Sequence, residues 1–275
     1  MITQEKIFII AKTYPTHSSK YKELVCTAGI RENGEWVRLY PIPFRQMYKN
    51  SQFNKYTWIE AELDKPFNDH RPDSKKINIS SIEIIEHINT ENNWARRRQL
   101  ILEKAPIYTN LNTIIEKAQK ENSMSLCTFK PTKYLGVEIV KKQETKKLTQ
   151  VEKMKFTNAN RSLFDEDSSA MDFISMPEIP YKFKLPFLDD SGKKSSMSII
   201  DWEISQLYLN LKKREKSEDI VLQKVKEKLE GFIEKNDLYL FLGTMRQMHS
   251  HVNNPYIIIG LFYPPKVKHY QGTLF

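Results

Sequence analysis

Aromatic and basic side chains alternate along one short segment near the start of the chain. Trp36, Arg38 and Tyr40 occupy every second position of GEWVRLYPIPFR, so on an extended strand their side chains leave the same face. Rings that stack on bases and guanidinium groups that pair with phosphates bind single-stranded nucleic acid. The alternative is that the two rings close a second small core, with the arginine bonded to a carboxylate.

More basic and aromatic residues follow this segment and extend the predicted interface. A helix would fan the run from Arg96 through Arg97 to Arg98 across most of one turn, at about 100° per residue. Guanidinium groups placed in this way clamp phosphates, whereas a solvated helix face is the structural alternative. The other predicted members of the interface are Arg45, Lys55, Tyr56 and Trp58.

Two segments carry residues that could take part in catalysis. Asp69 and Asp73 lie in FNDHRPDSKK, where carboxylates beside a histidine could hold a divalent metal. His249 and His251 could act as acid and base or as ligands. The sequence favours a salt-bridged turn and a ligand-contacting loop instead, because no nucleophile, further acid or third ligand stands at a useful spacing. No metal or other cofactor is therefore expected, and Mg²⁺ would be needed only by a metal-dependent nuclease.

The composition favours a polyanionic partner. Lysine and arginine number 43 against 34 acidic residues, which gives a net charge of +9, and 11% of the residues are aromatic. Cys26 and Cys127 lie in apolar surroundings without a second cysteine or histidine pair, so neither a zinc site nor a disulfide framework is predicted. The first apolar stretch is too short for a signal peptide or a membrane span, so we expect a cytoplasmic protein without a membrane partner.

The hydrophobic pattern predicts an α+β protein, and its 275 residues favour two domains. Residues 1–92 read as strands, with Asn33-Gly34 as a hairpin turn, and residues 93–142 read as a helical segment followed by a short strand pair. A connection is predicted over 143–178. Residues 179–275 are predicted as an α+β domain in which Asp201 caps a helix and a second helix runs from Ser217 to Asn236.

The N-terminal third resembles the prokaryotic dual OB-containing domain family. The family pattern joins a C-x-A-G-I strand to a G-x-W-[IV]-R return strand. The matching residues are Cys26, Ala28, Gly29, Ile30, Gly34, Trp36, Val37 and Arg38. The resemblance implies an OB-like β-barrel over 1–92 whose partner is single-stranded nucleic acid or an oligonucleotide. The C-terminal blocks, IPYKF with DWE and FLGT with IIIGLFYPP, resemble uncharacterised bacterial proteins, some of them found near phage-defence genes.

The last five residues, QGTLF, resemble the bacterial sliding-clamp-binding peptide. Gln271 would fix the register, while Leu274 and Phe275 would fill an apolar pocket of the clamp. The alternative is a terminal apolar pair that folds back on its own domain.

Taken together, these features predict a nucleic-acid-binding protein, with DNA favoured, that acts in DNA transactions or phage defence. A metal-dependent nuclease or nucleotide-processing enzyme and a clamp-binding adaptor are the alternatives. The sequence leaves open whether the chain catalyses a reaction.

Overall fold

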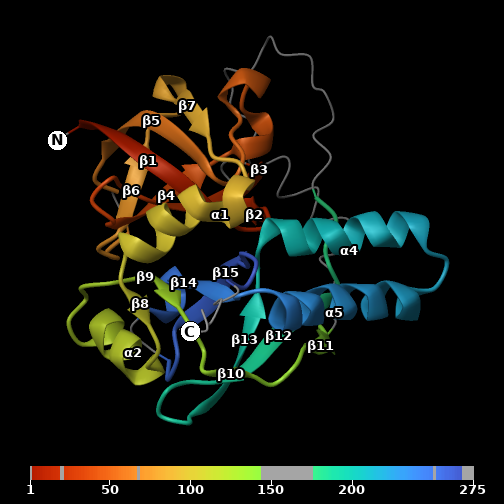
Figure 1. The fold of residues 1–275 in the computed structure, drawn as a ribbon. Coiled ribbons are helices and arrows are strands. Elements are labelled where there is room, and N and C mark those ends of the chain that lie inside the picture. The colour runs from red at the N-terminus through yellow and green to blue at the C-terminus, as the bar shows by residue number, and fades with distance from the viewer. Residues whose placement is uncertain (1, 19–21, 67–68, 144–175, 250–251, 268–275) are drawn as a thin grey trace, which may run out of the picture.

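The computed structural model describes residues 2–18, 22–66, 69–143, 176–249 and 252–267. Over these ranges the chain forms a barrel, shown in red and orange at the top of Figure 1, and a second region built on a separate sheet below it.

The first region is a closed five-stranded barrel with OB-like topology. The strand order is β1-β3-β4-β6-β5, and β5 pairs with β1 to close the barrel. The β4–β6 pairing is parallel and the other four pairings are antiparallel. This arrangement confirms the predicted OB-like barrel. The strands are β1 (Thr3–Lys12), β3 (Lys22–Ile30), β4 (Trp36–Ile42), β5 (Thr57–Asp64) and β6 (Ser74–Ile77), with β2 (Thr16–Ser18) beside β3 and β7 (Glu83–His87) beside β5.

Strict alternation of side chains fills the inside of the barrel. Val37 and Leu39 of β4 are fully buried there, and Ile59, Ala61 and Leu63 follow every second position of β5. Because side chains of a strand point alternately to its two faces, the residues between them point outward. The aliphatic residues of the return strand, Val37 and Leu39, therefore face the barrel core, whereas Ala28 and Ile30 of β3 belong to the apolar core outside the barrel.

The second region is a mixed sheet covered on one face by helices. The strand order is β10-β12-β13-β15-β14-β9-β8, and β11 pairs with β12. Side chains from α2, α4 and α5 pack against this face in one apolar core, and Figure 1 shows α4 and α5 as an antiparallel pair that projects to one side. The strands are β8 (Ile107–Tyr108), β9 (Leu126–Phe129), β10 (Lys133–Tyr134), β11 (Glu138–Lys141), β12 (Tyr181–Leu188), β13 (Lys194–Ile199), β14 (Tyr239–Thr244) and β15 (Tyr256–Phe262), and the helices are α2 (Leu111–Gln119), α4 (Trp202–Arg214) and α5 (Glu218–Lys235).

Two of the predicted helix boundaries are observed. The Asp201 carboxylate accepts a hydrogen bond from the Glu203 amide at 2.7 Å and caps α4. The second helix, α5, begins after Ser217 and ends before Asn236, although the Ser217 side chain makes no capping bond. Between the two regions lies α1 (Glu91–Arg98), which continues as a π-helical turn over 99–103.

A shared apolar core joins the barrel to the second sheet. Phe8, Ala28 and Trp36 point out of the barrel wall, and Phe241 and Phe262 of the sheet pack against them. In OB folds, the outer face of the second and third barrel strands is the usual ligand surface. Here those strands are β3 and β4, and the second region covers the middle of their outer face.

Candidate nucleic-acid interface

The side chains of Trp36, Arg38 and Tyr40, here called the outer stripe, leave the barrel wall together but end in three different environments. Trp36 is 9% exposed and meets the Phe241 ring edge-on, with the ring centroids 5.6 Å apart. Arg38 is 2% exposed, whereas Tyr40 is 37% exposed. The prediction that the stripe faces solvent is therefore wrong for the first two residues, because β9 and β14 pack over them, and it holds only for Tyr40.

The Arg38 guanidinium ties the barrel to the beginning of β9. Its terminal nitrogens donate to the Cys26 thiol at 3.3 Å and to the carbonyl and hydroxyl oxygens of Ser125 at 3.2 Å each. Within the described ranges, its Nε has no hydrogen-bond partner. The Asp73 carboxylate accepts from the Ser125 amide at 2.6 Å, so Ser125 is held from two sides. In this position Arg38 fastens the two regions and is closed off from a phosphate in solvent.

The β5–β6 loop forms the salt-bridged turn that the sequence favours. Arg71 donates to both carboxylate oxygens of Asp69, at 2.9 and 2.6 Å, and Ser74 adds a third hydrogen bond at 2.9 Å. Burial opposes the charge of Asp69, but the hydrogen bonds and charge of Arg71 outweigh it and lower the pKa of Asp69 to about 2. Arg71 also donates to the Thr244 carbonyl at 2.6 Å, which links this loop to the end of β14.

Both ring nitrogens of His249 are engaged in structural hydrogen bonds. The ring nitrogen Nε2 lies 3.0 Å from the side-chain oxygen Oδ1 of Asn122, and Nδ1 lies 2.9 Å from the Thr244 hydroxyl. Because the Asn122 amide nitrogen donates to the His70 carbonyl, its oxygen faces the histidine, and Nε2 is the protonated nitrogen. Burial, followed by the charges of Arg71 and Arg38, lowers the pKa of His249. His249 therefore joins two loops as a neutral ring, with no nitrogen left for acid–base work.

The other residues of the predicted catalytic alternative do not come together in one site among the described residues. Burial raises the pKa of Asp73, whose carboxylate is occupied by Ser125. Among the residues that the structure describes, no group of three or more histidine, cysteine or acidic side chains could hold a metal ion. His251 lies outside the described residues, as do Gln271, Leu274 and Phe275 of the predicted clamp-binding peptide.

Lys55 is buried against the start of α4 and Tyr56 against α1 and β15, so their predicted exposure is wrong. The Lys55 ammonium binds Asp201 at 3.1 Å and Glu203 at 3.0 Å. Burial opposes this charge, but chiefly the Asp201 carboxylate outweighs it and raises the pKa of Lys55. Tyr56 is 6% exposed, and the Arg97 guanidinium lies 3.9 Å from its ring centroid. The Lys55 ammonium is thus an internal partner for the two carboxylates at the start of α4.

A second buried lysine, which sequence reasoning did not single out, lies beside this group. Lys12 donates to the Phe53 carbonyl at 2.8 Å and lies 4.1 Å from the centroid of the Phe44 ring. Burial, followed by the charge of Lys55, lowers the pKa of Lys12 to about 8. In the sequence, Lys12 is simply the charged residue that ends an apolar strand. Only the fold shows that its side chain is buried.

The three consecutive arginines are separated by their partners and form no common clamp. Arg96 pairs with Glu86 on the surface, and Arg97 is buried and donates to the Ile88 carbonyl at 2.8 Å. Arg98 donates to the carbonyl oxygens of Asn93 and Pro265. The positive φ angles at residues 92–94 interrupt the helix, so the arginines stand at the start of the right-handed helical turns that continue to residue 103, as predicted.

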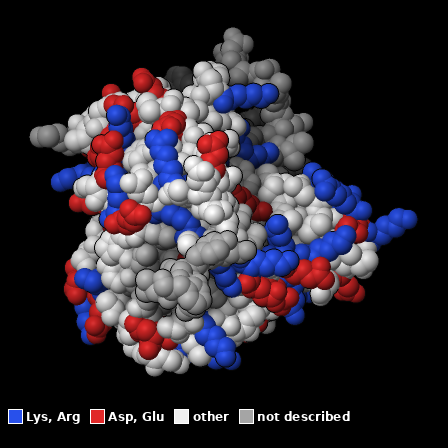
Figure 2. Space-filling view, in the orientation of Figure 1, with Lys and Arg blue, Asp and Glu red and all other residues white. Residues whose placement is uncertain are grey.

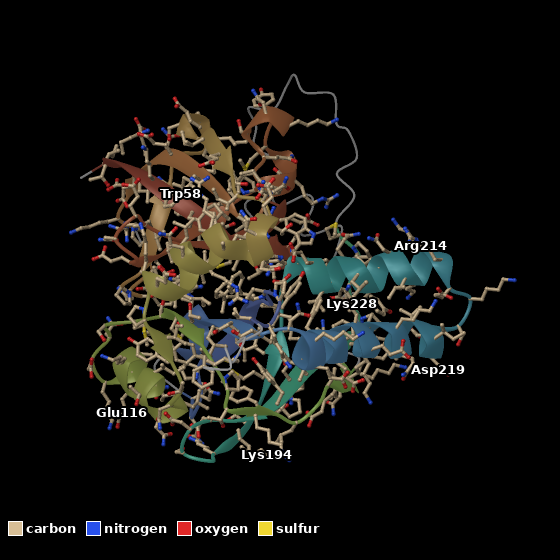
Figure 3. All side chains as sticks on the ribbon, viewed as in Figure 1. Trp58, Glu116, Lys194, Arg214, Asp219 and Lys228 are labelled. Atoms are coloured by element: carbon tan, nitrogen blue, oxygen red, sulfur yellow. The ribbon has the colours of Figure 1, made fainter. Side chains whose placement is uncertain are left out.

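Arg45 and Trp58 remain partly accessible at the edges of the barrel. Arg45 pairs with Glu23 at 2.7 Å. The ring of Trp58, labelled in Figure 3, packs on Phe8 with centroids 5.3 Å apart. Arg45 lies after the end of β4 and Trp58 lies on β5, so neither continues the row of side chains that ends at Tyr40. The predicted interface therefore does not form one continuous platform.

An exposed surface does form around Tyr40, where loops from both regions meet. Burial raises the pKa of Tyr40, while the nearby positive charges of Arg246 and Arg71 oppose the shift, so these charges act on the phenol. Arg246 opens a short 3-10 helix after β14 and is exposed, as are Met245 and Met248 beside it. We call Tyr40, Met245, Arg246 and Met248 the Tyr40 surface.

The opposite end of the outer stripe borders a cleft of about 590 Å³. Its walls are the β3–β4 turn, the beginning of β6 and the segments that lead into β8 and β9. Lys75, Lys104 and Tyr108 line it and were not singled out by sequence reasoning. The signal that was missing is the approach of the β3–β4 turn to the segment before β8, where Gly34 meets the Lys104 backbone, and it cannot be read from local patterns.

The net positive charge is distributed over much of the molecule. Figure 2 shows lysine and arginine side chains intermixed with acidic ones over the barrel, and a further group of basic side chains over the α4–α5 pair. On the face that Figure 2 shows, overall charge therefore does not single out one binding surface.

The fold defines an OB-like barrel joined to an α+β region, an architecture that fits nucleic-acid binding in general. A family model described as a domain of unknown function (DUF8758) matches residues 3–103. A second, described as a domain of unknown function (DUF8757), matches residues 108–275, more than half of the chain, and the protein belongs to this family. No curated protein matches the chain. No helix in the described ranges has the length and apolar character needed to cross a bilayer.

Proposed function

We propose that the protein binds single-stranded nucleic acid, preferentially DNA, through the Tyr40 surface. The observation that carries this proposal is the position of Tyr40: it is the one ring of the outer stripe that stays open to solvent on an OB-like barrel. OB folds use this outer face and its flanking loops to bind oligonucleotides. The β5–β6 loop, which carries Asp69 and Arg71, lies within electrostatic range of Tyr40.

The side chains around Tyr40 match the chemistry of a single strand. A base stacked on an aromatic ring is typically stabilised by ~1–3 kcal/mol without selection of sequence. Arg246 is exposed next to the ring and can pair with a phosphate, while the flexible thioethers of Met245 and Met248 can follow an irregular ligand surface. Arg71 is already bound to Asp69, so Arg246 is the cation we assign to the backbone.

Fluorescence anisotropy with a labelled oligothymidylate tests the role of the ring. We expect Tyr40→Ala to weaken binding by about 1–3 kcal/mol, roughly fivefold to 150-fold in Kd. Tyr48→Ala is the matched control, because Tyr48 is 85% exposed in the connection between β4 and β5. Equal losses in the two variants, or no binding by the parent protein, would contradict the proposal.

The same assay at several salt concentrations tests Arg246. Affinity should fall as salt rises. Arg246→Ala should reduce the slope of log affinity against log salt concentration by about one, which corresponds to one phosphate contact. Arg214→Ala at the far end of α4, labelled in Figure 3, is the control and should leave the slope unchanged. Binding that does not depend on salt would rule out the phosphate contact.

The finer parts of the proposal rest on the sequence resemblance. These finer parts are three: a role in DNA transactions or phage defence, a relation to the dual OB-containing family, and the preference for DNA. A panel of single- and double-stranded DNA and RNA, with and without Mg²⁺, separates these possibilities and reports cleavage in the same experiment. The clamp-binding peptide stays a separate prediction that deletion of residues 271–275 can test.

A further inference from the structure

The cleft beside Trp36 has the size of a small-molecule site and a lining that is in large part charged. Its volume of about 590 Å³ lies within the range of roughly 300–1,000 Å³ that is usual for ligand pockets. It is separated from the Tyr40 surface by β9, because Ser125 sits over Arg38 in the middle of the outer stripe. A ligand in the cleft would therefore be held independently of the surface proposed for nucleic acid.

Three cations from three different segments line the cleft, together with two carboxylates: Glu35, which pairs with Arg31 at 3.6 Å, and Asp73, which accepts from the Ser125 amide. Arg31 comes from the end of β3, Lys75 from β6 and Lys104 from the segment before β8. Arg31 is paired with Glu5 at 2.6 Å, and Lys104 donates one hydrogen bond to the Glu32 carbonyl. No ion pair or hydrogen bond is formed by the Lys75 side chain with the described part of the chain. An ammonium group has three donors, so Lys75 and Lys104 both retain donors for an anion.

Flat apolar groups line the same cleft as these cations. Pro72, Pro106 and Tyr108 line the cleft with Trp36. The indole Nε1 of Trp36 is buried and has no acceptor among the described residues, and a buried unpaired donor costs about 1–3 kcal/mol. Rings and prolines beside cations suit a ligand that has a planar ring and a phosphate.

Two walls of the cleft are fixed against each other before any ligand binds. A Cβ atom at Gly34 would lie only 2.1 Å from the Lys104 carbonyl oxygen, so the β3–β4 turn touches this segment at van der Waals distance. The Lys104 ammonium returns to the Glu32 carbonyl at 2.9 Å. A site that is already formed loses less free energy to ordering when it binds.

We infer that this cleft binds a nucleoside 5′-phosphate. The phosphate lies against Lys75 and Lys104, and the base lies against the planar wall formed by Tyr108, Pro72 and Pro106. The inference does not depend on the proposed function, because it concerns a free nucleotide at a site apart from Tyr40.

Isothermal titration calorimetry of the full chain with each of the four nucleoside 5′-monophosphates tests the inference. We expect one-to-one binding of at least one of them, with adenosine and inorganic phosphate binding more weakly than the best nucleotide. Lys75→Ala should weaken that binding about tenfold, the equivalent of one charge-assisted hydrogen bond. Lys76→Ala is the matched control, because it is the next residue of β6 and does not line the cleft. Melting temperatures of both variants show whether they remain folded.

Three outcomes would overturn the inference: no nucleotide binds at about 1 mM, inorganic phosphate binds as tightly as the best nucleotide, or Lys75→Ala and Lys76→Ala have the same effect. Tyr40→Ala should leave the nucleotide titration unchanged while it weakens oligonucleotide binding. The two proposals can therefore fail separately.

Discussion

Asp69 shows how one carboxylate holds the loop beneath the Tyr40 surface. Its pKa is lowered to about 2 from the ordinary value of 3.8 because Arg71 outweighs the effect of burial. The unfolded chain therefore takes up a proton at a higher pH than the folded chain does. The stabilisation is complete above pH 3.8 and is lost as the pH falls towards 2.

Replacement of Asp69 by asparagine should remove this stabilisation and its pH dependence. Arg71 is 8% exposed as a side chain, and a buried cation without its partner costs about 3 kcal/mol. We expect Asp69→Asn to lower the free energy of unfolding by about that amount at pH 7, and to flatten its decline in acid. Urea unfolding at a series of pH values measures both effects. Asp219→Asn at the exposed beginning of α5 is the control. An Asp69→Asn protein that is as stable as the parent, and whose free energy of unfolding still falls in acid as before, would refute the assignment.

At the scale of the elements, the β3–β4 turn depends on a single glycine. Gly34 has a φ of +86°, and its α-carbon approaches the backbone of Lys104 too closely for any side chain. Gly192, in the turn between β12 and β13, has a similar φ of +78°, but a Cβ there meets nothing within 4 Å. The two turns share their backbone conformation and differ in crowding.

Alanine substitutions at the two glycines should separate strain from crowding. A left-handed residue other than glycine costs on the order of 1–3 kcal/mol wherever it stands. Gly34→Ala should cost more than Gly192→Ala, because it must also push away the Lys104 backbone. Thermal unfolding of the two variants gives the comparison. Equal losses would mean that the turn does not rest against residue 104 in solution.

The elements were largely predictable from the sequence, and their contacts were not. Period-two alternation located β4 and β5, and it separated the aliphatic barrel core from the outer stripe. Alternation does not show which residues cover an outward face, because the covering residues come from far along the chain. Arg38 meets Ser125, 87 positions away, and Lys55 meets Asp201, 146 positions away. The Asp69–Arg71 turn was predictable because both residues lie in one short loop. The cleft was not, because its walls come from four separated segments.

At the scale of the whole molecule, the two regions should not fold well apart. Residues 1–103 alone would expose Phe8, Ile10 and Trp36, which the second sheet buries in the full chain, and each large apolar side chain contributes about 1.5–3 kcal/mol on burial. We expect this fragment to aggregate or to bind a hydrophobic dye, as measured by gel filtration and dye fluorescence. Co-expression with residues 104–275 should restore a dye-negative particle. A monomeric, dye-negative fragment would show that the shared core is dispensable.

The cover over the middle of β4 also limits the length of a single strand that the proposed Tyr40 surface could contact. A strand that lies on Tyr40 cannot continue along β4 towards Trp36, because Ser125 and Leu126 occupy that path. Lengthening an oligonucleotide should therefore stop improving its affinity sooner than on a fully open OB barrel, where the occluded length is about 4–16 nucleotides. Such a short footprint suits the recognition of ends, gaps or small fragments rather than the coating of long tracts.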